Sequence, residues 1–189
     1  MTERADRLAG YRHRRDHFFA EHPHSPLRES QRAEFAGLDY FPERADLALN
    51  LPLDESGPEV GETVELLTSD GKAKSFSRLG RIRFDVDDEP VELTVFKDSD
   101  RGSLFIPFRD ASAGRDTYEV GRYLEPQARP DGTLEVDFNY AYNPFCAYGA
   151  GWSCPIPPEE NHVTVTIAAG EKVFADPEET MPRSADLSE

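Results

Sequence analysis

Residues 91–109 read VELTVFKDSDRGSLFIPFR, and this stretch decides the fold class. Every second residue from Val91 to Val95 is apolar, which is the spacing that places alternate side chains on one face of a β-strand. Asp100-Arg101-Gly102 is a turn signal, and a second run of strand-forming residues follows it. The stretch therefore predicts two antiparallel strands, 91–97 and 103–109, joined by a tight turn.

The same period-two pattern continues on both sides of this hairpin. Turn signals such as Pro130-Asp131-Gly132 separate the runs, and the absence of a helical pattern between them argues against a parallel α/β sheet. Short strands at such intervals are typical of an antiparallel barrel or sandwich, so we expect a mainly β fold. The other candidate strands are 45–51, 62–68, 73–79, 81–87, 133–138 and 162–168.

Two helices are predicted before the strands. Residues 3–21 carry one apolar stripe at helical spacing. Ser25 is a candidate N-cap in front of Pro26, because proline is favoured at the first position of a helix. Gly37 can end the second helix in a left-handed conformation, so we expect that helix over 26–36.

The length of 189 residues suits one domain of ordinary size. We expect one β-rich domain over residues 1–175, with the N-terminal helical pair within about 3–36. The acidic end of the chain, 176–189, is expected to be a disordered tail.

The charge of the chain restricts its partners and its surroundings. It has 21 basic and 37 acidic residues, a net charge of −16, and lysine occurs at four positions. A surface this acidic repels nucleic acid and anionic membranes, so neither is expected as a partner. High salt screens the repulsion between carboxylates, which points to a halophilic cytosol. The chain shows no transmembrane run and no apolar signal-peptide centre near its N-terminus, so we expect a cytoplasmic protein.

Residues 107–161 are too polar, aromatic and turn-rich for simple strands. Several short blocks of polar and aromatic residues follow one another along this segment. They are Phe108-Arg109-Asp110, Gly114-x-x-Thr117-Tyr118, Gly121-Arg122-Tyr123-Leu124, Asp137-Phe138-Asn139, Ala141-Tyr142-Asn143-Pro144, Cys146-Ala147-Tyr148, Cys154-Pro155-x-Pro157-Pro158 and Asn161.

These blocks resemble the signature of the domain-of-unknown-function family 1684. The resemblance covers roughly residues 10–174 and includes Tyr40-Phe41-Pro42 upstream and Ala169-Gly170-Glu171 downstream. It implies a bacterial and archaeal protein family with no established activity, so the function has to be argued from the residues.

The first hypothesis is a cavity that binds a small anionic or carbonyl-bearing ligand. Arg122 can bind a carboxylate or phosphate through its guanidinium fork, with Tyr118 and Tyr123 as aromatic walls. Two side-chain amides near the Pro-rich turn can donate hydrogen bonds to the same ligand. These amides belong to Asn139 and Asn143, and Tyr142 lies between them as a further wall residue.

The second hypothesis is a cofactor-free hydrolase or isomerase in which Asp110 or Asp137 moves a proton. The third is a structural or partner-binding module, because buried Asp–Arg pairs with Tyr and Asn also satisfy the backbone of irregular segments. Sequence alone leaves all three open. It also leaves open the oligomeric state and whether any cofactor binds.

The cysteines and histidines give weaker signals. Cys146 and Cys154 have seven residues between them, which is neither a CxxC motif nor a metal-pair spacing. They are interpreted as buried structural thiols or as a thiol or disulfide pair. A nucleophilic Cys146 would need a partner that stabilises its thiolate, and no histidine lies near it in the sequence. His13 and His17 share a helix face but lack the glutamate of a metalloprotease helix, so no metal site is predicted.

Overall fold

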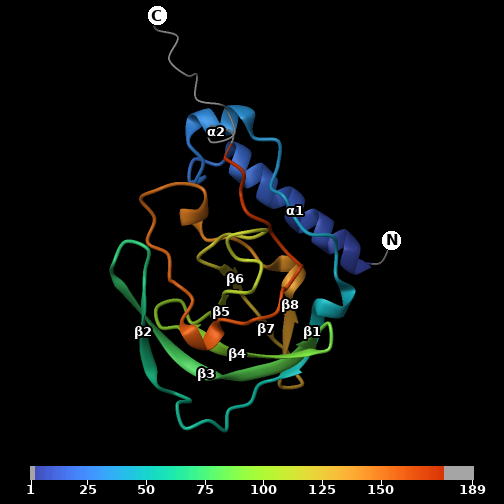
Figure 1. Cartoon of the computed structure of the whole chain (residues 1–189), viewed down its shortest axis with the longest axis vertical. Coiled ribbons are helices and arrows are strands. Elements are labelled where there is room, and N and C mark those ends of the chain that lie inside the picture. Colours follow the sequence, from blue (N-terminus) through green and yellow to red (C-terminus); the bar gives the residue numbers. More distant parts are fainter. Residues whose placement is uncertain (1–2, 177–189) are drawn as a thin grey trace, which may run out of the picture.

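The computed structural model describes residues 3–176, and its strands form two antiparallel sheets. The larger sheet has the order β2-β3-β4-β5-β6 and curves into a half-barrel, and the smaller has the order β1-β8-β7 (Figure 1). The predicted mainly β antiparallel fold with N-terminal helices is confirmed. The strands are β1 (Ala48–Pro52), β2 (Thr63–Leu67), β3 (Ala73–Val86), β4 (Glu89–Asp98), β5 (Leu104–Phe108), β6 (Arg122–Leu124), β7 (Gln127–Ala128) and β8 (Thr133–Asp137).

The hairpin of β3 and β4 is the longest pairing in the larger sheet. Asp87 and Asp88 connect the two strands, and both have a positive φ, 49° and 68°. Two consecutive residues of this conformation form the turn type whose twist matches that of paired strands, and Asp tolerates it. The turn sets the register, in which Val86 lies opposite Glu89.

Gly80 explains why β3 is one strand, although the sequence predicted two strands over 73–79 and 81–87. The pairing with β4 shifts by one residue between Arg78 and Gly80, which is a β-bulge inside a continuous strand. A Cβ atom at Gly80 would lie 2.5 Å from the carbonyl oxygen of Asp54. The glycine therefore allows a neighbouring segment to approach and does not end the strand.

The main hydrophobic core lies between the half-barrel and the smaller sheet. Apolar side chains of β3, β4, β5 and β6 meet those of β8 and of the segment around residue 167. Its fully buried members include Leu47, Ile82, Leu93, Val95, Ile106, Phe108, Val136, Phe138 and Ile167. A second cluster, on the other face of the half-barrel, contains Leu66, Phe76, Phe96, Phe105 and Tyr123.

The segment 162–168 is not a strand, in contrast to the prediction. It runs beside the end of β5, where Val163 N–H donates to the carbonyl of Arg109. Farther along, the N–H of Ile167 donates to the Asp110 carboxylate at 2.7 Å in place of a backbone carbonyl. The alternating burial that suggested a strand is present, but a side chain replaces part of the ladder.

The N-terminal helices pack on the body through aromatic residues. Figure 1 shows α2 at the end opposite β3 and β4, and α1 running from there along one side of the body. Helix α1 (Glu3–Glu21) has the predicted bounds. Helix α2 (Glu29–Glu34) is shorter than predicted because the hydroxyl of Ser25 accepts the N–H of Leu27 in a turn before it. Four single 3₁₀ turns complete the elements of residues 3–176, at Ala45–Leu47, Phe138–Tyr140, Phe145–Ala147 and Glu159–Asn161.

Neither helix in the described part of the chain combines the length and the apolar character needed to cross a membrane. The predicted tail lies outside the described residues except for Asp176.

Candidate functional site

Arg122 lies inside the protein and is fully buried. Its guanidinium donates to the carbonyl oxygens of Ile167 at 2.8 Å and Ala169 at 2.5 Å, and more weakly to that of Glu171 at 3.2 Å. The Asp110 carboxylate lies 3.4 Å away. Burial lowers the pKa of Arg122, and the nearby carboxylates oppose this effect. In this position the predicted anion clamp binds the chain's own carbonyl groups.

Asp110 connects three segments beside Arg122. It accepts hydrogen bonds from the Ser112 hydroxyl at 2.8 Å and from the backbone of Ile167 at 2.7 Å. Ser112 in turn bonds the hydroxyl of Thr117 at 2.8 Å. This Arg122 cluster, made of Arg122, Asp110, Ser112 and Thr117, is closed to solvent, and it fixes the 110–117 loop against the chain around residue 167.

Asp137 and Asn139 form a separate group at the end of β8. The Asp137 carboxylate accepts the N–H of Asn139 at 3.0 Å and caps the 3₁₀ turn that follows. The buried amide of Asn139 accepts from the N–H of Arg44 and donates to its carbonyl, both at 2.8 Å. The other Asp137 oxygen pairs with Arg4 at 3.2 Å. Asp137 also lines a shallow cleft of about 280 Å³ together with Tyr140.

Asn143 belongs to a third buried group, which centres on Glu171. The Glu171 carboxylate pairs with Arg15 at 2.8 Å and accepts from the Asn143 amide at 3.2 Å and from the Tyr148 hydroxyl. Burial raises the pKa of Glu171, and the nearby Arg15 charge opposes this effect. The side-chain amide oxygen of Asn143 (Oδ1) is buried and accepts no hydrogen bond from residues 3–176.

A cleft with several aromatic side chains in its lining lies beside Asn143 and has a volume of about 390 Å³. The half-barrel contributes one wall, and the loop 143–155 contributes the other. We call it the aromatic cleft. Its aromatic lining residues are Phe76, Phe105, Tyr123, Tyr142, Phe145 and Trp152, and its charged ones are Lys74, Asp98, Arg101 and Glu125.

The two tyrosines of the aromatic cleft are held in place by hydrogen bonds. Tyr123 donates to the carbonyl of Pro155 at 2.5 Å, and its ring packs edge-on against Phe105 at 4.8 Å. Tyr142 donates to the Glu125 carboxylate at 2.6 Å. Burial raises the pKa of both tyrosines, so their rings remain neutral walls.

The charged residues of the aromatic cleft differ in how they are paired. Lys74 binds the Asp98 carboxylate at 2.5 Å, and Asp98 also accepts the N–H of Asp100 at 2.9 Å and of Arg101 at 3.0 Å. Burial opposes ionisation of Asp98, but these hydrogen bonds outweigh it and lower its pKa. The Arg101 side chain is exposed and has no ion-pair partner in the described part of the chain. Arg101 is thus the unpaired cation of this cleft.

Tyr118 lies apart from the other predicted residues. Its hydroxyl lies 3.9 Å from the sulfur of Cys146, and burial raises its pKa. The sequence analysis assigned these residues to one site, but the fold separates them. Tyr123, Tyr142 and Asn143 line the aromatic cleft, and the other predicted site residues do not. Nowhere in residues 3–176 do three His, Cys, Asp or Glu side chains gather in a way that could hold a metal ion.

Sequence reasoning missed Lys74, Arg101, Phe105 and Trp152 as cleft residues. Arg101 lies in a turn that was recognised, but a turn arginine is normally solvated and carries no signal of its own. Phe105 and Trp152 are separated by more than forty residues, and they line one cleft because the loop 143–155 lies against the half-barrel.

These features define a class of protein: a half-barrel of antiparallel strands with a helical cap, a closed polar interior and an aromatic cleft. The sequence profile of the family described as "Protein of unknown function (DUF1684)" matches residues 33–172. The chain belongs to this family, as its residue blocks indicated.

A solved structure supports the same assignment. The chain is similar to an uncharacterised protein of Haloarcula marismortui whose structure was determined in solution by NMR, with 37% sequence identity and a TM-score of 0.65. The similarity covers 89% of this chain and 93% of the other. The comparison with curated proteins gives no match.

Proposed function

We propose that the protein binds a small molecule in the aromatic cleft, and that this ligand carries a planar apolar part and an anionic or carbonyl group. One observation carries the proposal: an exposed, unpaired arginine stands beside a concave surface of aromatic rings. Ligand pockets commonly combine an apolar lining with a few polar groups that orient the ligand. Arg101 and the rings of Phe105 and Tyr123 supply these two elements.

Arg101 takes the anion-binding role that the sequence suggested for Arg122. An exposed guanidinium can form a bidentate contact with a carboxylate or phosphate without breaking an internal pair. Arg122 would have to leave three backbone carbonyls and Asp110 to do the same.

The catalytic alternative uses Asp110 or Asp137 as a proton donor or acceptor. Asp110 is committed to Ser112, Ile167 and Arg122 and faces the interior, which does not favour it. Asp137 lines a different cleft from the aromatic one. The structural alternative is favoured by one specific observation: the Arg122 cluster is closed, and such a cluster stabilises a fold whether or not a ligand binds.

The setting proposed for this activity is a cytosol of high salt. The net charge of −16 supports it, and the similar protein from Haloarcula marismortui is a halophilic neighbour. The same charge disfavours nucleic acid and anionic membranes as partners. The unfolding temperature should fall when potassium chloride is lowered from molar to millimolar concentration, and an unchanged temperature would contradict this setting.

Trp152 offers a direct test of binding because it is the only tryptophan of the chain and lines the aromatic cleft. Aromatic carboxylates that do not emit in the tryptophan range, such as phenylacetate, should change the emission of Trp152 in a saturable way. The matching neutral amides should bind more weakly, because they lack the charge that Arg101 recognises.

Variants then separate the three hypotheses. Phe105→Leu should weaken binding of the carboxylates because it removes one aromatic wall, whereas Asp137→Asn should leave their affinity unchanged. If no compound of this class changes Trp152 emission, and Phe105→Leu alters only stability, the structural alternative replaces the binding proposal.

A further inference from the structure

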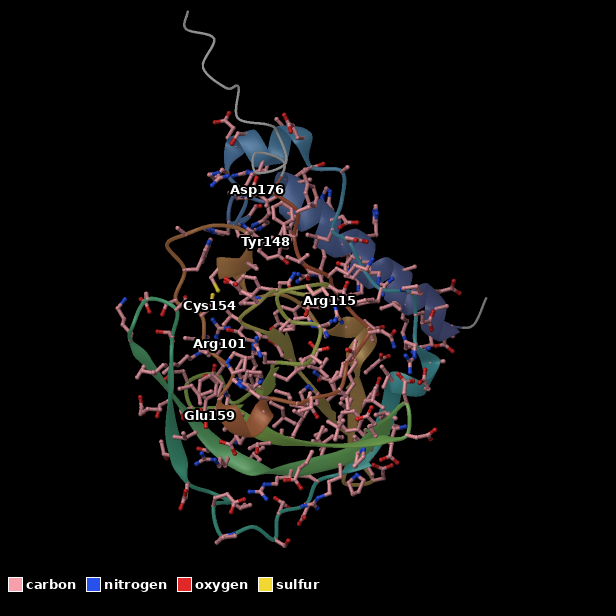
Figure 2. The ribbon with its side chains drawn as sticks, viewed as in Figure 1. Arg101, Arg115, Tyr148, Cys154, Glu159 and Asp176 are labelled. Atoms are coloured by element: carbon pink, nitrogen blue, oxygen red, sulfur yellow. The ribbon has the colours of Figure 1, made fainter. Side chains whose placement is uncertain are left out.

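Cys146 and Cys154 form a thiol pair at the edge of the aromatic cleft, where Figure 2 shows sulfur beside the Cys154 label. Both are free cysteines, and their side chains interact in the folded chain. Ser69 binds the backbone at the end of the loop that joins the two cysteines. Its N–H donates to the Cys154 carbonyl at 2.9 Å, and its hydroxyl accepts the Cys154 N–H at 3.1 Å. Ser69 therefore fixes the backbone of Cys154, whose side chain interacts with that of Cys146.

The two thiols have unequal surroundings. Cys146 is partly exposed and borders a second cleft of about 640 Å³, which we call the sulfur cleft and which Trp152 separates from the aromatic cleft. Cys154 is buried, with 8% of its surface exposed. The hydrogen bond from Cys154, together with that from Tyr118, lowers the pKa of Cys146 to about 6, although burial opposes this effect. The same bond raises the pKa of Cys154.

We propose that Cys146 and Cys154 are a redox-active dithiol in which Cys146 attacks a low-molecular-weight disulfide and Cys154 then closes an intramolecular disulfide. The assignment of roles follows from access and contact. Cys146 is partly exposed and faces a cleft large enough for a small disulfide, whereas Cys154, which lines the aromatic cleft, is buried and lies beside Cys146.

The reaction balances in two exchange steps. The Cys146 thiolate attacks one sulfur of RS–SR, so a mixed disulfide forms, the RS–SR bond breaks and RS⁻ leaves to take up a proton. Cys154 then gives up its proton and attacks the Cys146 sulfur, and the second RS⁻ leaves and is protonated. The cysteines lose two electrons and two protons in total, and the small disulfide gains them as two thiols.

The loop between the thiols permits the closure. Forming an S–S bond shortens the sulfur–sulfur distance to about 2.05 Å, so the backbone between the cysteines has to adjust. Gly149, Ala150 and Gly151 lie in this loop, and Gly151, at φ +93°, has no atom within 4 Å of a Cβ position. The loop thus borders open space at Gly151.

The test uses the reduced full-length protein in high salt, with hydroxyethyl disulfide as the oxidant and intact-mass measurement at timed acid quenches. Wild type should lose two hydrogens without accumulating an adduct. Cys154→Ser should stop at the mixed disulfide, because the second thiol is missing. Cys146→Ser should react with the disulfide at about one tenth of the wild-type rate or below, because the remaining thiol is buried and protonated.

Ser153→Ala is the matched control, since it changes the same loop and keeps both thiols. Unfolding temperatures of all variants show whether the fold is retained, and early quenching of wild type identifies the first cysteine modified if a variant does not fold. Equal rates for the two cysteine variants, a first adduct on Cys154, or a persistent mixed disulfide in wild type would each overturn the proposal.

The pH dependence gives a second readout. Alkylation of wild type by iodoacetamide should be half-maximal near pH 6, because the thiolate is the reactive form and the pKa of Cys146 is about 6. A midpoint at the ordinary thiol value of about 8.5 would contradict the assigned roles. The titratable and charged groups that face the pair or line the sulfur cleft are Tyr118, Glu119, Tyr123, Tyr148, Arg28, Asp70 and Asp176.

Discussion

The Arg122 cluster and the aromatic cleft both combine arginine, carboxylate and aromatic groups, but they treat the arginine differently. In the cluster, Arg122 is fully buried and directed at backbone carbonyls and Asp110. In the cleft, Arg101 is exposed, and the nearby Asp98 pairs with Lys74. Residue type therefore does not distinguish a site from a folding core, whereas the pairing of each charge does.

The largest effect is expected from Arg122→Ala. This change leaves the buried Asp110 charge and three carbonyls without their partner, which should lower the free energy of unfolding by about 3–5 kcal/mol. Denaturant unfolding in high salt measures it. Arg109→Ala is the matched control, because Arg109 is exposed and should change stability by less than about 0.5 kcal/mol. A stable Arg122→Ala protein that loses ligand binding would reverse the comparison.

Asn139→Ala should have the next largest effect. The Asn139 amide satisfies both backbone groups of Arg44 inside the protein, so its loss should lower the free energy of unfolding by about 1–3 kcal/mol. The exposed Asn50 on β1 is a suitable control for the substitution itself. If Asn139→Ala is as stable as Asn50→Ala but impairs function, Asn139 belongs to a site and not to the closed interior.

Asp98→Asn tests the paired charges at the edge of the aromatic cleft. At neutral pH it should lower the free energy of unfolding by about 1 kcal/mol, because Lys74 loses its partner and the turn N–H groups lose a charged acceptor.

The effect of Asp98→Asn should depend on pH. The folded-state pKa of Asp98 is lowered, so its stabilisation is present above the unfolded pKa of about 3.9 and is lost as pH falls through the folded value. The difference between wild type and Asp98→Asn should therefore shrink in acid, relative to that of the exposed neighbour Asp100→Asn. A difference that is constant from neutral pH to below pH 3 would show that the Asp98 charge contributes nothing.

The smallest effect on stability is expected from Arg101→Ala, at less than about 0.5 kcal/mol, because Arg101 pairs with nothing in residues 3–176. The affinity of the Arg101→Ala protein for aromatic carboxylates, measured through Trp152 emission, should nevertheless fall about tenfold. Arg115→Ala removes an exposed arginine that does not line the aromatic cleft and should change neither quantity. Equal affinities of the Arg101 and Arg115 variants would remove Arg101 from the proposed site.

The strands and the long helix were predictable from sequence because their signals are local. The helix over 3–21 follows from the spacing of its own apolar residues, and the β4–β5 hairpin from strand patterns on both sides of a turn. The predicted strand 162–168 shows the limit of this reasoning. Alternation reports burial, and here a carboxylate from Asp110 takes over one hydrogen bond that a strand would have made with backbone.

The candidate site was predictable only in part, since Tyr123, Tyr142 and Asn143 line the aromatic cleft and Arg122 does not. The sequence by itself determined the antiparallel β class, the family, the acidic surface and the segment in which polar and aromatic residues concentrate. Only the tertiary structure decided which arginine is buried and which faces a cleft, and that the two cysteines meet. The physical reason is that burial and pairing of a charge depend on residues distant in the chain, whereas strand and helix patterns depend on near neighbours.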